Sequence, residues 1–563
     1  MENGCDQKTT TIHYLNLAQM KQLILTSFIS LLIYSASAQS RDSISVALDL
    51  IGLSFGDAEI DSMRNSVVEE ASNYREMRKL SIPNDMSYSL VFTPPLNTQT
   101  ISNEQNDINW NLKEKVALPK NRSDLAFYTV HQLSSLIKNK KITSVELTQF
   151  FLDRLRKYGD TLECVITLTD SLALAQAKRA DAELQQGIYR GPLHGIPYGA
   201  KDLLAVKGYK TTWGAMAYKD QQLDYNATVI DKLEKSGAVL VAKLTLGALA
   251  WGDVWYGGLT KNPWDLTTGS SGSSAGSTSA TVAGLVPFAI GSETWGSIVS
   301  PATRCGATGL RPTFGRVSKQ GAMALSWSMD KLGPICRNAI DCALVLEAIR
   351  GEDGLDYSVR DFPFNYDYTK NIKKLRIGYL KDEFKPDTFN QQNDSTLIEL
   401  LKTKGINLVE KQLSSDIPAA ALSFILSAEA GAAFDELTRS RRDTLLVRQI
   451  KNAWPNVFRA ARLIPAVEYI QANRLRHQLT LQFNDLMKDI DVLIAPSFSR
   501  QLLITNLTGH PCVVLPDGSY AGDNPGTITL LGNHFDEANI LMFARYLQEL
   551  TPYDEEYPPL FLK

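Results

Sequence analysis

Residues 269–297 read GSSGSSAGSTSATVAGLVPFAIGSETWGS. Six serines and three glycines stand in the first twelve positions, a composition that gives up side-chain packing in exchange for close backbone approach and many hydroxyl groups. A flexible Gly/Ser linker is one interpretation of this composition. The apolar run at 282–290 favours a second interpretation, in which the loop is held against a helix or strand buried in a core.

Outward from this stretch, short apolar runs alternate with helical patterns. The runs at 239–242 (VLVA) and 492–495 (VLIA) are typical of buried strands, and the segments at 227–235 and 340–349 have helical apolar spacing. Strands and helices that alternate along a chain are typical of α/β proteins. We therefore expect a mostly parallel or mixed β-sheet.

Composition and charge exclude several classes of protein. The chain has 563 residues, of which 44% are hydrophobic and 21% charged, and its formal net charge is −3 at pH 7. This is the composition of a globular protein with a sizeable core. Nucleic-acid-binding proteins usually have a basic surplus, so we expect no nucleic-acid partner. The six cysteines include no CxxC pair that would indicate a zinc or redox site.

The N-terminal region has the pattern of a secretory signal. Lys21 precedes the apolar stretch LILTSFISLLIY, and Ala36-Ser37-Ala38 has the A-x-A form of a cleavage site. We expect residues 1–19 to be an upstream extension, translation to start at Met20, and cleavage to follow Ala38. The mature protein would then be periplasmic or secreted, without a stable membrane anchor. An amphipathic N-terminal helix is the alternative.

The remaining chain divides by composition. Helical apolar spacing over 42–80 predicts a small N-terminal helical segment at 39–92. Residues 93–124 are rich in Pro and Asn and have little periodicity, so we expect a linker. One large domain is expected over 125–555, followed by a C-terminal tail at 556–563.

Two familiar motifs can be tested against the Ser/Gly stretch. A phosphate-binding loop needs Gly-Lys-Ser/Thr, and GST at 276–278 has no lysine. GSSAG at 272–276 matches the G-x-S-x-G of α/β-hydrolases, which predicts an esterase with Ser274 as nucleophile. That alternative also needs a downstream acid and a histidine. The candidate histidines are His477, His510 and His534.

Several motifs taken together are more specific than either of these. GPLHGIPYGAKDLLAVKG stands at 191–208, GSETWGSIVSPATRCGATGLRPTFGRVS at 291–318, SMDKLGPICR at 328–337 and TNLTGHPCVVLPDG at 505–518. In this order they resemble the amidase signature family, over most of residues 125–555. The resemblance implies a single α/β domain with a mixed β-sheet core covered by helices. It also implies hydrolysis or transfer of carboxamides with no metal or other cofactor.

The resemblance further implies a Ser–cis-Ser–Lys triad. The family's lysine corresponds to Lys201, its bridging serine, held through a cis peptide, to Ser273, and its nucleophile to Ser297. Lys201 lies in an apolar stretch where a charged ammonium is costly to bury, so a neutral lysine base fits. The backbone N–H groups that the resemblance assigns to the oxyanion are those of Thr294, Trp295, Gly296 and Ser297.

The chain departs from the family's usual Asp-Thr-Gly-Gly-Ser-Ile-Arg at Glu293, Trp295 and Val299. Trp295 cannot adopt backbone angles that are open only to Gly, and its indole would narrow the acyl pocket. A catalytically inactive, amidase-fold binding protein is therefore a further alternative. Asp330 and Arg337 are interpreted as supporting residues of the motif.

We expect an exported hydrolase that cleaves the C–N bond of a small-molecule amide through an acyl-enzyme on Ser297. The family's ammonia-releasing component for tRNA-dependent amidation is disfavoured, because that reaction needs cytosolic tRNA, ATP and partner subunits. An alternative to a catalytic lysine is a surface ion pair between Lys201 and Asp202. The sequence leaves the oligomeric state open, with a homodimer among the possibilities.

Overall fold

The computed structural model describes residues 40–86, 89–96, 104–112, 115–384, 391–413, 416–520 and 526–563. The chain forms two compact units, residues 1–83 and 84–563. The expected signal segment at 20–38 lies outside the described residues. Within the described ranges, no helix is both long enough and apolar enough to cross a membrane.

In the first unit, the described residues form two helices, α2 (Arg41–Leu50) and α3 (Asp57–Met77). The hydroxyl of Ser40 accepts the N–H of Ser43, which satisfies one of the free donors at the start of α2. Ile44 and Leu48 of α2 pack against Ile60 of α3 in a small apolar cluster. Helices are thus present in the 42–80 region whose spacing predicted them.

The second unit is built on an 11-stranded sheet of the described residues, in the order β1-β3-β2-β8-β10-β9-β14-β15-β13-β11-β12. The sheet is mixed, as expected: β2 pairs in parallel with β3 and β8, whereas β10 pairs antiparallel with β8 and β9. The strands are β1 (Val165–Leu168), β2 (Pro197–Lys201), β3 (Val239–Leu244), β8 (Ala289–Glu293), β9 (Thr308–Arg311), β10 (Lys331–Cys336), β11 (Ile377–Leu380), β12 (Leu408–Lys411), β13 (Val492–Pro496), β14 (Cys512–Pro516) and β15 (Thr527–Gly532).

Two short hairpins stand beside this sheet: β4 (Val254–Trp255) with β5 (Gly258–Leu259), and β6 (Lys261–Asn262) with β7 (Asp265–Gly269). The apolar runs at 239–242 and 492–495 form β3 and β13, which are buried throughout. Continuous apolar runs suit such strands because both faces of the sheet are covered.

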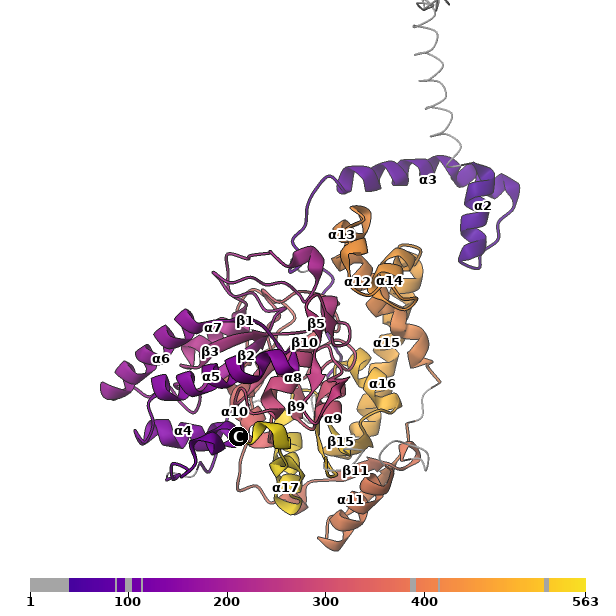
Figure 1. Ribbon diagram of the computed structural model, residues 1–563. Coiled ribbons are helices and arrows are strands. Elements are labelled where there is room, and N and C mark those ends of the chain that lie inside the picture. The colour runs from indigo at the N-terminus through magenta and orange to yellow at the C-terminus, as the bar shows by residue number, and fades with distance from the viewer. Residues whose placement is uncertain are drawn as a thin grey trace, which may run out of the picture. The chain divides into compact units, whose positions relative to one another are not determined.

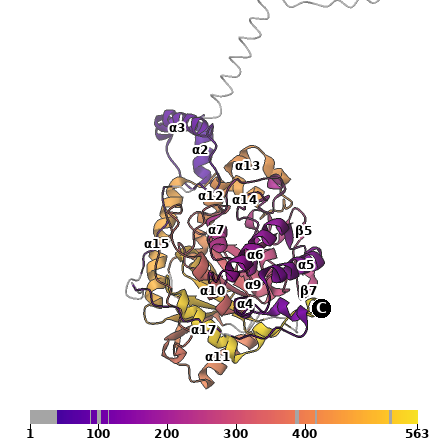
Figure 2. The same ribbon diagram turned by 90° about the vertical axis from the view of Figure 1, so that its left-hand side faces the viewer.

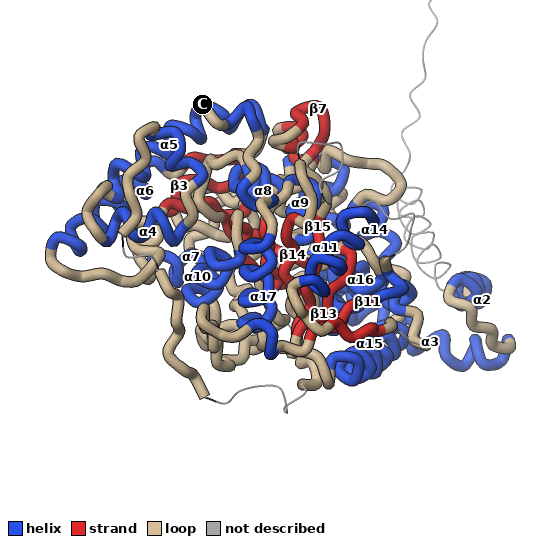
Figure 3. The backbone as a smooth tube through the Cα atoms, turned by 90° about the horizontal axis from the view of Figure 1, so that it is seen from below, coloured by secondary structure: helices blue, strands red, loops and turns tan. Residues whose placement is uncertain are grey.

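Helices surround the strands, which occupy the interior in Figure 3. Figures 1 and 2 agree that α5 and α15 lie at opposite sides of the unit. The helices of this unit are α4 (Val130–Lys138), α5 (Ser144–Leu162), α6 (Asp170–Gln185), α7 (Thr228–Lys235), α8 (Ala275–Val282), α9 (Val299–Cys305), α10 (Ala339–Ile349), α11 (Gln391–Thr403), α12 (Phe424–Ala433), α13 (Asp435–Arg439), α14 (Trp454–Ala461), α15 (Ala466–Met487), α16 (Arg500–Thr508) and α17 (Glu537–Leu550).

The Ser/Gly stretch is part of the core. It enters α8, leaves through β8, and is buried at every position from 273 to 294. The flexible-linker interpretation is therefore wrong, because a linker leaves its residues in solvent. The small side chains let α8 approach the sheet closely: a Cβ on Gly276 would lie 2.5 Å from the carbonyl oxygen of Cys164.

Two segments outside the predicted large domain pack on it. In the expected linker, Trp110 stacks on Tyr366 with ring centroids 5.2 Å apart. In the expected tail, Phe561 is fully buried against Tyr158, and its carbonyl accepts a hydrogen bond of 2.7 Å from Arg154. Both segments thus add apolar contacts to the surface of the unit.

Candidate active site

Lys201 is the last residue of β2, where the strand ends between β3 and β8. Its side chain is fully buried, and its Nζ lies 2.8 Å from Oγ of Ser273, 3.1 Å from Oγ of Ser274 and 2.8 Å from Oγ of Ser292. Three hydroxyl groups thus surround the amine. Ser292 was not among the residues predicted from the sequence, and Ser274 was predicted only as a rival nucleophile.

Burial lowers the pKa of Lys201 well below its usual value of 10.5, although the charges of Asp330 and Glu293 oppose this shift. The alternative of a surface ion pair with Asp202 is wrong. Asp202 is itself fully buried, and its carboxylate bonds Lys243 at 2.7 Å and the N–H of Thr212 at 2.7 Å. The direct hydrogen-bond partners of the Lys201 amine are thus neutral hydroxyl groups, and burial favours its uncharged form.

Ser273 is positioned by a close approach of two backbone segments. The Gly272–Ser273 peptide bond is cis, as the resemblance implied. A Cβ on Gly272 would lie only 1.9 Å from the carbonyl oxygen of Gly252, so the position accepts only glycine. This contact holds the turn that carries Ser273 against the loop at 252.

Ser297 stands between β8 and α9 and is half-buried. The N–H of Ser274 donates a hydrogen bond of 3.1 Å to its carbonyl oxygen, which joins the Ser273 segment to the Ser297 segment. A second tie joins the hydroxyls of Ser271 and Ser300 at 2.7 Å. The three residues of the predicted triad are thus brought into one region, with a direct side-chain contact between Lys201 and Ser273.

The loop before Ser297 presents its backbone N–H groups. In the described part of the chain, no hydrogen bond uses the N–H of Trp295, Gly296 or Ser297 as donor. Gly296 has φ of 106°, a conformation that side chains rarely adopt. Trp295 is not among the described non-glycine residues with positive φ, and its side chain is 37% exposed. The indole is accordingly accommodated where the family usually has glycine, because the Gly-only angles fall on the next residue.

Glu293 holds this loop in place through hydrogen bonds and an ion pair. Its carboxylate accepts the N–H groups of Ile298 at 2.8 Å and Val299 at 2.9 Å, and it pairs with Arg311 at 2.8 Å. Burial alone would raise the pKa of Glu293, but Arg311 and Lys331 bring it below its usual value. A charged carboxylate therefore fixes the turn that leads out of Ser297.

Replacing Glu293 by glutamine is expected to destabilise the fold by about 3–5 kcal/mol, because Arg311 would stay buried without its counter-ion. Urea denaturation followed by circular dichroism measures the change. Glu410→Gln serves as control, since Glu410 pairs with Lys381 in solvent and its loss should barely move the midpoint. Equal shifts of the denaturation midpoint in the two variants would show that the buried contacts of Glu293 do not stabilise the fold.

The histidines needed by the esterase alternative are engaged elsewhere. His510 lies 2.8 Å from the hydroxyl of Thr508, and Nε2 of His534 lies 2.9 Å from the carbonyl oxygen of the same residue. His477 is exposed. The described contacts of the Ser274 hydroxyl are instead with Lys201 and Ser292. A Ser274–His pair therefore has no support in this geometry.

Within the described ranges, no group of three or more His, Cys, Asp or Glu residues is placed to hold a metal ion. The five described cysteines are free and buried.

The chain is similar in sequence to known proteins. A protein-family model named Amidase matches residues 146–503. The glutamyl-tRNA(Gln) amidotransferase A subunit of Coxiella burnetii (strain Dugway 5J108-111) is 32% identical over an alignment of 480 positions, which covers 77% of this chain and 99% of that protein. Its counterpart in Dehalococcoides mccartyi (strain CBDB1) is 31% identical over an alignment of 495 positions, which covers 78% of this chain and 100% of that protein.

The chain is also similar to solved structures. The native peptide amidase from Stenotrophomonas maltophilia is 27% identical and superposes with a TM-score of 0.68, covering 78% of this chain and 99% of that chain.

Proposed function

Because the chain belongs to the amidase signature family, we propose that it hydrolyses the C–N bond of small linear carboxamides through an acyl-enzyme on Ser297. Ser273 relays protons between Ser297 and Lys201. The observation that carries this proposal is the buried amine of Lys201, whose Nζ lies 2.8 Å from Oγ of Ser273. Only a neutral amine in such a place can serve as a base near neutral pH.

In acylation, Oγ of Ser297 attacks the amide carbonyl and its proton passes to Oγ of Ser273, whose own proton passes to Nζ of Lys201. The C–N bond then breaks as the proton returns from Lys201 to the departing nitrogen, which leaves as ammonia or an amine. Water attacks the resulting ester in deacylation and gives its proton along the same path. The carboxylic acid departs and Ser297 is restored.

The negative charge that develops on the carbonyl oxygen needs donors that are already in place. The N–H groups of Thr294, Trp295 and Gly296 are proposed for this role, together with that of Ser297. The side chain of Thr294 is held by a hydrogen bond of 2.5 Å to Asp330, which keeps the loop in position. Each such donor contributes about 2.7–4 kcal/mol in other enzymes.

An ammonia-supplying role is the second candidate, favoured by the 32% identity to the amidotransferase A subunit of Coxiella burnetii. Two features favour the free-standing hydrolase. The signal-like pattern at 20–38 supports export, away from tRNA and ATP. The described chain also extends beyond the family match, with α2, α3 and residues 84–86 and 89–96 before it.

The purified chain alone is expected to release ammonia or amine from simple aliphatic and aryl amides. A coupled ammonia assay and an amine assay over a panel that includes glutamine measure this, with the Ser297→Ala protein as blank. Turnover confined to glutamine would favour the ammonia-supplying role. No turnover, together with no fluorophosphonate adduct on Ser297, would favour the inactive binding protein suggested by Trp295.

A further inference from the structure

A small cavity lies directly beside the candidate catalytic lysine. It is lined by Ser292, whose hydroxyl is 2.8 Å from Nζ of Lys201, and by Thr294 of the proposed oxyanion loop. Its volume is about 30 Å³, which is enough for one or two small groups and not for a whole amide substrate. The cavity is therefore suited to one end of a substrate.

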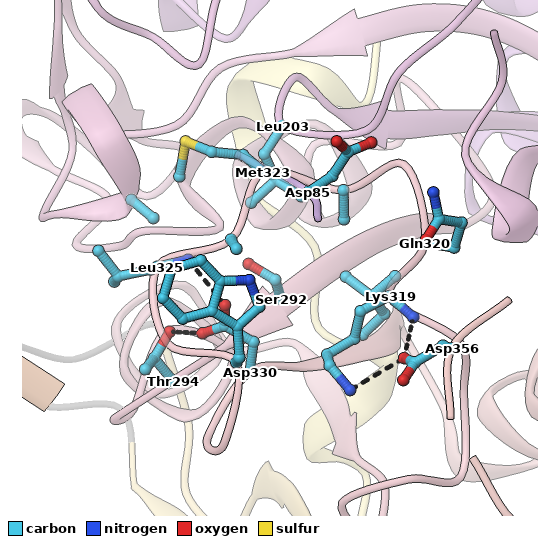
Figure 4. Close-up of a pocket in the computed structure, with 15 residues that line it drawn as sticks. Asp85, Leu203, Ser292, Thr294, Lys319, Gln320, Met323, Leu325, Asp330 and Asp356 are labelled. Carbon is cyan, nitrogen blue, oxygen red and sulfur yellow. Dashed lines mark hydrogen bonds and ion pairs between the residues drawn. The ribbon is translucent and has the colours of Figure 1, made fainter. Parts of the chain in front are cut away.

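One wall of this cavity comes from outside the part of the chain that matches the family, because Asp85 precedes residue 146. Asn84 fixes that wall: its side chain accepts the N–H of Ala324 at 2.7 Å and donates to the carbonyl oxygens of Ala324 at 3.1 Å and Ala433 at 3.2 Å. Figure 4 shows Asp85 on the side of the pocket opposite Thr294 and Asp330.

Two carboxylates of the lining, those of Asp85 and Asp330, have no cation paired with them in the described part of the chain. Lys319 is paired with Asp356 at 2.9 Å. Asp330 accepts hydrogen bonds from Thr294 and from the N–H groups of Leu325 and Ser326, at 2.5–2.9 Å. Asp85 forms no ion pair in the described part of the chain, and it is hydrogen-bonded to the phenol of Tyr225. The cavity therefore carries a net negative charge.

Apart from Gln320, the rest of the lining is apolar. It includes the indole of Trp327 and the side chain of Met323, together with the smaller groups of Leu203 and Ala250. An aromatic face and an uncompensated carboxylate at the wall of a small apolar cavity are the features that attract an alkylammonium group. A carboxylate or phosphate ligand would instead be repelled by the negative charge of Asp85.

We propose that this cavity selects amides that carry a protonated amine, with the ammonium held by Asp85 while the amide lies at Ser297. This inference rests on the proposed function, because it names the substrate class for the same site. The amine can belong to the acyl group or to the departing amine, and the chemistry at Asp85 is the same in both.

Equilibrium binding to the full chain with Ser297→Ala tests this without turnover. Glycinamide, β-alaninamide, γ-aminobutyramide and δ-aminovaleramide are titrated by calorimetry against propionamide, butyramide, valeramide and hexanamide, in which a methyl group replaces the ammonium. A second arm compares mono-N-acetylated diamines with N-alkylacetamides. The best amine is expected to bind about tenfold more tightly than its neutral counterpart, as for a charge-assisted hydrogen bond.

Adding Asp85→Asn should abolish that preference while leaving the affinity for neutral amides within about twofold. Asp224→Asn is the matched control. Asp224 precedes Tyr225 in the sequence, its side chain is 90% exposed, and it does not line the cavity. The preference for amines should therefore persist in this variant. Equal binding of amines and neutral amides in both arms, or a preference that survives Asp85→Asn, would overturn the proposal. If the preference depends on Asp85 but the wild-type protein hydrolyses no amide, the amine site stands and the proposed hydrolysis fails.

Discussion

Replacing Ser297 by alanine is expected to lower kcat for amide hydrolysis at least about 10⁴-fold, because the variant has no group to form the acyl-enzyme. KM should change little, since the proposed oxyanion donors are backbone groups that remain. Steady-state ammonia release measures both constants. The half-buried hydroxyl is no part of the core, so the folded state should be retained, which circular dichroism checks.

Ser300→Ala is the control for this variant. Ser300 lies in the first turn of α9, three residues after Ser297, and its hydroxyl contacts Ser271 rather than Lys201. Its kcat should stay within a few-fold of wild type. Similar activity in the Ser297→Ala and Ser300→Ala proteins would contradict the assignment of the nucleophile.

Replacing Lys201 by methionine is expected to lower kcat by about 10²–10⁴-fold, the usual contribution of general acid–base catalysis. Methionine preserves the length of the buried side chain, but its thioether is not basic enough to accept the proton from Ser273. In the wild-type protein, kcat/KM should fall as the pH drops through the pKa of Lys201, which burial places well below 10.5. That acidic limb should be absent in the variant.

Stability provides an independent readout for Lys201. Its pKa in the folded protein is lower than in the unfolded chain, so between the two values the unfolded state binds one more proton. This contribution makes stability rise with pH across that window. Lys331 shifts in the same direction, so the comparison must be between wild type and Lys201→Met. The variant should be at least as stable as wild type at neutral pH in urea denaturation. A marked loss of stability there would indicate that Lys201 is charged and paired.

Much of the fold was predictable because its signals are local. The apolar runs at 239–242 and 492–495 became buried strands, and the apolar run after the Ser/Gly loop became the end of α8 and β8. Local sequence patterns do not determine which strands become neighbours in the sheet. Ser292 meets Lys201 because β2 and β8 pair in parallel, with Ala200 opposite Ile290, and no spacing along the chain encodes that pairing.

Charged partners were the least predictable part of the site. Asp202 follows Lys201 in sequence, yet it lies just past the end of β2 and pairs with Lys243 of β3 instead. Asp85 lies outside the family motifs altogether, so no resemblance could place it at the cavity. The ion pair between Glu293 and Arg311 likewise forms only through a tertiary contact.

Trapping the acyl-enzyme tests the role of Ser297 most directly. Wild-type protein turning over an aryl amide or its aryl ester is quenched in acid, digested and analysed by mass spectrometry. We expect an added acyl group on Ser297 that appears on the timescale of turnover and is absent from the Lys201→Met protein. An acyl group on Ser274 instead, or hydrolysis that proceeds with no acylated serine under conditions where deacylation is slowed, would contradict the proposed mechanism.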